Sequence, residues 1–110
     1  MSGGSSSLAA LQAAAALRNL ASNNVRNQHT IRDVGGVVAL VSLLHGSANS
    51  VAAQKAAGAL RNLASNPINQ DAIREASGIA PLVKLLAPGA PAEAVQQAAG
   101  ALRNLAANHV

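Results

Sequence analysis

A nine-residue block occurs three times along the chain at a nearly constant interval. It reads AALRNLASN at 15–23, GALRNLASN at 58–66 and GALRNLAAN at 100–108. The matching leucines, Leu17, Leu60 and Leu102, stand 43 and 42 residues apart. A fixed period of about forty residues is the signature of a repeat array. Each unit of such an array buries its apolar face by stacking on its neighbours, so the repeat constrains the fold more than any other feature.

The second and third copies of the block belong to two units that align with each other. With an offset of 42, Asn27-Gln28 matches Asn69-Gln70, and Leu40-Val41 matches Leu82-Val83. We therefore expect a flexible leader at 1–7 and a repeat array at 8–110. The array is divided into a partial unit at 8–23 and full units at 24–66 and 67–108.

Each full unit is predicted to contain a short, a medium and a long helix. In the first unit these are expected at about 27–34, 37–44 and 51–65, because Gly35-Gly36 breaks the helical pattern and a Gly/Ser-rich link precedes the long helix. The second unit repeats them at about 69–76, 79–86 and 93–107, and the partial unit holds one long helix at about 8–22.

The residues available for a core are small and aliphatic. Half of all residues are apolar, yet the chain has no Phe, Tyr or Trp. Alanine is the strongest helix former and lets helices pack closely, so the composition favours an all-α fold. The absence of cysteine excludes disulfides and thiolate metal sites and fits a reducing compartment. No segment approaches the ~20 apolar residues of a membrane span, and we expect no membrane partner.

This order of a short, a medium and a long helix, with a glycine break after the first, resembles the armadillo repeat. The resemblance covers 8–108, and GIAPLVKLL at 78–86 and AAGALRNLA at 98–106 carry it most clearly. It implies a right-handed α-solenoid with one leading third helix and two three-helix units. It also implies a non-enzymatic scaffold that binds an extended peptide or protein segment. A natural protein of this kind is expected in the cytoplasm or nucleus, and a designed one is a recombinant soluble protein.

A polar strip recurs on the predicted third helices. In the middle helix, Gln54, Gly58, Arg61 and Asn62 fall on one side, and the last helix repeats the pattern. An asparagine side chain both donates and accepts, so it can hold the backbone of an extended peptide. Because equivalent helices of a stacked array lie side by side, we expect one groove. Its candidate residues are Asn19, Asn62, Asn104, Arg18, Arg61, Arg103, Gln54 and Gln96.

The resemblance assigns roles to most of this strip. An asparagine at this place in the armadillo motif grips the ligand backbone, and basic residues beside it in the catenin branch receive acidic or phosphorylated peptides. The matching positions here are Asn19, Asn62 and Asn104, with Arg18, Arg61 and Arg103 beside them. An acidic peptide is therefore one expected ligand.

One position departs from the importin-type pattern, which places a tryptophan one turn before the asparagine. Here the residues are Ala15, Gly58 and Gly100, which cannot form a cation–π pocket, so recognition of a nuclear-localisation signal is not expected. If Gly58 faces the groove, replacing it by tryptophan should be tolerated.

Two other hypotheses remain open. The Arg and Asn pattern would also recur if the unit had simply been copied, without any ligand. Near-identical copies and ends without an evident cap are typical of a designed or reconstructed minimal array, which would self-associate through its exposed ends. The net charge of +4 favours acidic partners, but nucleic-acid binding is unlikely without aromatic stacking residues or a dense Lys/Arg cluster.

The residue types that carry catalysis or bind metals are scattered. His29, His45 and His109 lie in three separate predicted segments, without metal-ligand spacing. The four acidic residues form no pair, and no glycine-rich phosphate-binding motif occurs. We expect no enzyme activity, no catalytic residue, no metal and no cofactor.

Overall fold

The computed structural model describes residues 3–46 and 48–107. These residues form seven α-helices and no strand, which confirms the predicted all-α class. The helices are α1 (Gly3–Ala21), α2 (Val25–Asp33), α3 (Gly36–Leu43), α4 (Val51–Leu63), α5 (Pro67–Glu75), α6 (Ile79–Lys84) and α7 (Ala92–Ala106).

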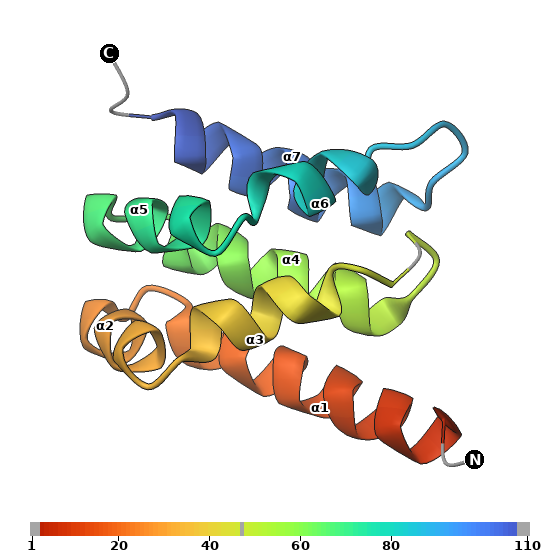
Figure 1. Ribbon diagram of the computed structural model, residues 1–110, viewed down its shortest axis with the longest axis horizontal. Coiled ribbons are helices and arrows are strands. Elements are labelled where there is room, and N and C mark those ends of the chain that lie inside the picture. The colour runs from red at the N-terminus through yellow and green to blue at the C-terminus, as the bar shows by residue number, and fades with distance from the viewer. Residues whose placement is uncertain (1–2, 47, 108–110) are drawn as a thin grey trace.

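The helices lie in two layers (Figure 1). The long helices α1, α4 and α7 form one layer, in which α4 packs on α1 on one side and on α7 on the other. The shorter helices α2, α3, α5 and α6 form the second layer, with α3 resting on α4 and α6 on α7. Equivalent helices of successive units are thus neighbours, as expected of a stacked array.

The predicted boundaries are close to the observed ones, with two differences. The short helices α2 and α5 begin two residues earlier than predicted, because Asn24 and Asn66 are N-caps that accept from the backbone N–H groups three residues on. Helix α1 begins at Gly3, inside the segment assigned to a flexible leader, and the flexibility of that leader stays a prediction. Residues 1, 2 and 108–110 of the proposed leader and array lie outside the described residues.

The core is aliphatic and is centred on α4. Leu40, Leu60, Leu63, Ile73 and Leu82 have no exposed surface. Around them, α4 contributes four fully buried alanines, whose single methyl groups let neighbouring helices approach closely.

The turns between the first and second helices combine a left-handed residue with a glycine that follows it. The left-handed residue is Gly35, with φ of +90°, in one unit and Ser77, with φ of +63°, in the next, so glycine is not required at that position. Glycine is required one residue later, where a Cβ on Gly78 would come within 2.7 Å of Ile73 Cγ2. The break predicted between these helices therefore has a steric cause, namely the close crossing of one helix over the next.

We predict that Leu60→Asp unfolds the chain. The substitution buries a carboxylate with no partner in the packed core beside α4, a cost that exceeds the stability of a domain this small. Circular dichroism and urea unfolding would measure the loss. As a control, Leu20→Asp places the same charge on a leucine that is 51% exposed, and the folded signal should remain. A native-like melting curve for Leu60→Asp would contradict the prediction.

Candidate functional site

The arginine of each ALRNL block lies across the glycine of the next block. A Cβ on Gly58 would come within 2.7 Å of Arg18 Cδ, and a Cβ on Gly100 within 2.6 Å of Arg61 Nε. Gly58 and Gly100 are thus slots that accept the side chain of the preceding long helix. The condition attached to tryptophan at Gly58, that the position faces the groove, is therefore not met, because Arg18 buries this position.

The asparagine of each block also bridges two long helices. Asn62 Nδ2 donates to the carbonyl oxygen of Arg18 at 2.9 Å, and Asn104 Nδ2 donates to that of Arg61 at 2.9 Å. An asparagine amide has a second N–H and an acceptor oxygen, which these bonds do not use. The two half-buried amides are therefore held in place by the stack while keeping hydrogen-bonding capacity for a ligand.

Two open hollows follow this strip between the long helices. One, of about 430 Å³, is lined by Arg61, Gln96, Ala99, Gly100 and Arg103. The other, of about 360 Å³, is lined by Asn23, Val25, Gln28, Arg61, Asn62, Ser65, Arg103 and Asn104. Arg61 and Arg103 line both hollows, so their guanidinium groups and the amides of Asn62 and Asn104 share one continuous surface.

The structure brings together five of the eight candidate residues at the hollows, namely Arg61, Asn62, Gln96, Arg103 and Asn104. Arg18 and Asn19 lie on α1 and line neither hollow. Gln54 is placed differently from the sequence-based expectation. It is only 8% exposed, and its Nε2 donates to the carbonyl oxygen of Ala48, so it fastens the loop before α4.

Gln28 is a residue at the hollow that sequence reasoning missed. Its Oε1 accepts from Ser65 Oγ at 3.1 Å and from Asn66 Nδ2 at 2.9 Å, and its Nε2 donates to the carbonyl oxygen of Ala21. Gln28 thereby fixes the wall of the smaller hollow. The signal that could have revealed it is the repeated Asn-Gln pair, whose second glutamine, Gln70, makes the same kind of bond to Ala64.

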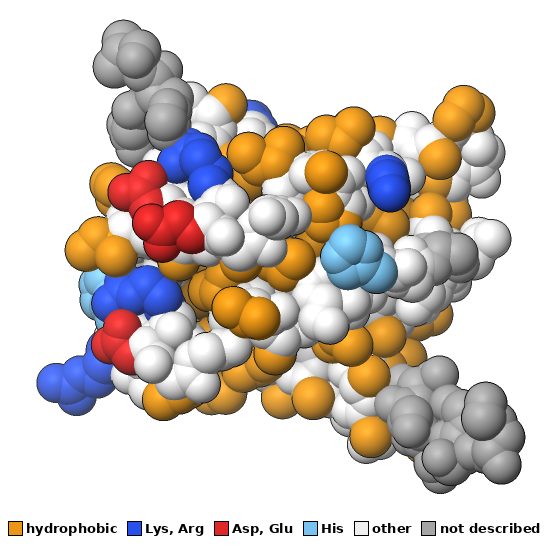
Figure 2. All heavy atoms as spheres, in the orientation of Figure 1, with side chains coloured by type: hydrophobic (Ala, Val, Ile, Leu, Met, Phe, Trp, Pro, Cys, Tyr) orange, Lys and Arg blue, Asp and Glu red, His pale blue; other side chains and the backbone are white. Residues whose placement is uncertain are grey.

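The charges along the strip are positive and not paired with carboxylates. Arg61 Nη1 donates to the neutral amide of Gln97 at 3.4 Å, and Gln97 Nε2 in turn donates to Glu93 Oε2 at 2.9 Å, so the nearest carboxylate on α7 reaches Arg61 only through that amide. The two ion pairs found within the described residues, Arg32–Asp33 and Arg74–Asp71, lie instead on the layer of short helices. Figure 2 shows the acidic side chains of that layer gathered over the ends of α2 and α5. The groove side of the molecule therefore presents guanidinium groups to a ligand.

The described part of the chain contains no group of three His, Cys, Asp or Glu residues that could hold a metal ion. Nor does any helix in that part have the length and apolar character needed to cross a bilayer. His29 Nδ1 lies 2.7 Å from Arg32 Nη1, His45 is exposed, and His109 falls outside the described residues.

Stacked three-helix units with a polar strip on their long helices define a helical repeat scaffold. The family model for the armadillo/beta-catenin-like repeat matches 24–65 and 66–107, most of the chain, and the protein belongs to this family.

Two solved structures resemble the chain closely. One is the crystal structure of an engineered protein, 42% identical, with a TM-score of 0.79, covering 87% of this chain and 23% of that one. The other is a designed armadillo repeat protein, YIII(Dq)4CqI, 31% identical, with a TM-score of 0.80, covering 88% of this chain and 40% of that one. The chain thus spans less than half the length of either protein. A comparison with curated protein sequences gives no significant match.

We predict that Gly100→Ala fails to stabilise the fold although alanine is the better helix former. The added methyl group would displace the flexible end of Arg61 from its slot, and the lost contact should offset the ~1 kcal/mol that alanine gains in helix propensity. Urea unfolding would measure it.

The control is a double-mutant cycle with Arg61→Ala, which empties the slot. In that background Gly100→Ala should raise the free energy of unfolding by ~1 kcal/mol, because the helix propensity of alanine then acts alone. Equal effects in both backgrounds would show that the arginine does not occupy the slot.

Proposed function

We propose that this chain is a non-enzymatic scaffold that binds an extended peptide or protein segment along α1, α4 and α7, with acidic peptides preferred. Armadillo repeats generally serve as binding scaffolds, and the proposal accords with the family of the chain. The observation that carries it is the shared surface on which Arg61 and Arg103 meet Asn62 and Asn104.

The geometry supports an extended ligand. Packed helices lie ~8–10 Å apart, and an extended chain advances ~3.3 Å per residue, so each long helix would meet roughly two to three ligand residues. The asparagine amides, already oriented by their bonds to the preceding helix, can bind the ligand backbone without further ordering.

The charge of the groove determines which ligands are preferred, and the small number of its contacts limits the affinity. The guanidinium groups of Arg61 and Arg103 suit carboxylates or phosphates on the ligand. A hydrogen bond contributes ~0.5–1.5 kcal/mol net. The few hydrogen bonds that three long helices can offer therefore support a dissociation constant in the micromolar range or weaker. Nucleic acid remains a disfavoured partner, because the chain has no aromatic residue on which bases could stack.

We predict that Arg103→Gln weakens binding of a glutamate-rich peptide of about eight residues by several-fold. Arg103 is exposed and lines both hollows, so its charge can be removed without disturbing the core. Isothermal titration at low and at high salt would measure the change, with the protein dilute.

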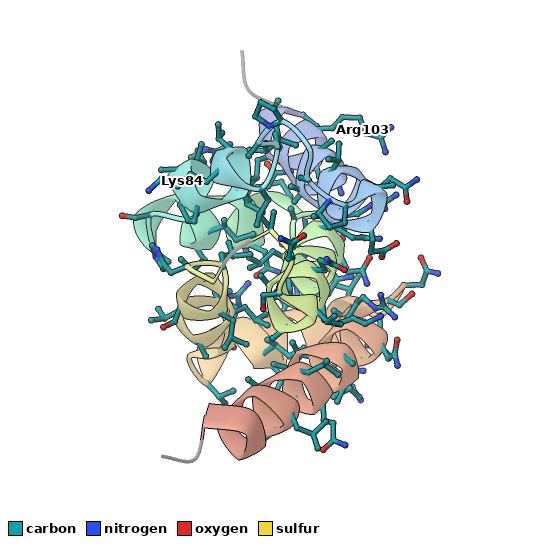
Figure 3. The ribbon with its side chains drawn as sticks, turned by 90° about the vertical axis from the view of Figure 1, so that its right-hand side faces the viewer. Lys84 and Arg103 are labelled. Carbon is teal, nitrogen blue, oxygen red and sulfur yellow. The ribbon has the colours of Figure 1, made fainter. Side chains whose placement is uncertain are left out.

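Lys84→Gln is the matched control, since it removes the same charge from an exposed residue. Figure 3 shows Lys84 and Arg103 on opposite sides of the molecule. Equal weakening by both variants would indicate general electrostatic attraction rather than a groove. Absence of binding by the unmodified chain would favour the alternative function, a designed or reconstructed minimal array without a natural ligand.

A further inference from the structure

The outer face of α1 is exposed, although the same face is covered in the other two long helices. Ala9, Gln12 and Ala16 are all exposed on α1. Their counterparts are half-buried or buried, and they are Ala52, Lys55 and Ala59 on α4 and Ala94, Gln97 and Ala101 on α7. Of these, Ala59, Ala94 and Ala101 have no exposed surface.

The outer face of α7 shows the complementary pattern. Ala99, Arg103 and Ala106 are exposed there. Their counterparts are Ala14, Arg18 and Ala21 on α1 and Ala57, Arg61 and Ala64 on α4, where all four alanines have no exposed surface. The outer faces of α1 and α7 are therefore the two halves of an interface that the structure contains twice, between α1 and α4 and between α4 and α7.

We propose that the outer face of α7 docks on the outer face of α1 of a second copy of this chain, so that copies stack head to tail. The new junction continues the internal interfaces in the same register. In that register Arg103 takes the place of Arg18 and Arg61, and the α1 residues of the second copy take the places of their α4 and α7 counterparts.

The polar groups match in this register. Internally, Arg61 Nη1 donates to Gln97 Oε1 at 3.4 Å, and the residue equivalent to Gln97 on α1 is Gln12. Asn62 and Asn104 each donate to the arginine carbonyl of the preceding helix, and their equivalent on α1 is Asn19, which is exposed. The Arg103 guanidinium would thus contact the amide of Gln12 in the second copy. The Arg103 carbonyl oxygen would accept from the amide of Asn19 in that copy.

Two features limit the strength of the junction. Ala15 stands where Gly58 and Gly100 form the arginine slots, so Arg103 must shift to avoid its methyl group. Among the helices of the described residues, none precedes α1 as a short helix of its own unit, so the junction consists largely of one helix against another. Self-association is therefore expected to be weak, and it is open-ended because the two faces differ.

The test is sedimentation of the unmodified chain from about 10 μM to about 1 mM, together with single variants at the two faces. We expect a series of species that grows with concentration beyond the dimer. Ala16→Glu blocks the α1 face and Ala99→Glu blocks the α7 face, because each places a charge in a close contact between alanines. Each variant alone should stay monomeric, whereas Ala39→Glu, on the exposed surface of α3, should associate like the unmodified chain.

Mixing the two blocked variants gives the sharpest result. Ala16→Glu keeps a working α7 face and Ala99→Glu keeps a working α1 face, so a mixture should form a one-to-one dimer and nothing larger. If circular dichroism shows that either variant has lost its helices, Gln12→Arg, which places a like charge opposite Arg103, and Ala106→Glu replace them at the same faces.

Three outcomes would overturn the proposal. They are a monomeric unmodified chain at the highest concentration, association of that chain that stops at a dimer, and a mixture of blocked variants that stays monomeric while the unmodified chain associates. The register has its own test in Ala15→Gly, which opens the missing slot and should tighten association by about fivefold or more. Unchanged or weaker association of that variant would overturn the register.

Discussion

The structure depends on how closely one long helix can approach the next. That approach is possible because the face of each helix is alanine and because Gly58 and Gly100 leave room for the arginine of the preceding helix. The asparagine amide then closes the same contact by donating to the arginine carbonyl. A larger residue at the glycine would displace the arginine from this contact, so the arginine, the asparagine and the glycine of successive ALRNL blocks form one stacking contact.

This double use of the block bears on the interpretation of its recurrence. Arg61 and Asn62 would be retained in every copy for packing alone, so their repetition is not by itself a sign of binding. Binding is favoured instead by the charge and the hydrogen-bonding groups that packing does not use. The guanidinium groups of Arg61 and Arg103 lack a carboxylate partner within the described residues, and the amides of Asn62 and Asn104 keep a donor and an acceptor.

The fold could be predicted from the sequence because three features each indicate the same stacked three-helix repeat. They are the 42-residue period, the glycine break and the alanine-rich long helix. The candidate site was predicted less well. The sequence places Gln54 and Asn62 on one side of a helix, but the loop that precedes α4 bends back and takes up the Gln54 amide. Side-chain partners that come from a neighbouring unit, such as the arginine over Gly58, cannot be inferred from the spacing within one helix.

The position of each arginine in the stack also makes the groove unequal along its length. Arg18 and Arg61 lie across glycines of the following helix, which restricts their side chains and covers part of their surface. Arg103 is on α7, the last helix of the described residues, and it stays exposed. It can therefore turn toward a ligand at little cost in packing, whereas Arg61 would have to leave its slot. A ligand carboxylate is accordingly expected to engage the α7 end of the groove first, and a copy docked on α7 would compete for the same guanidinium group.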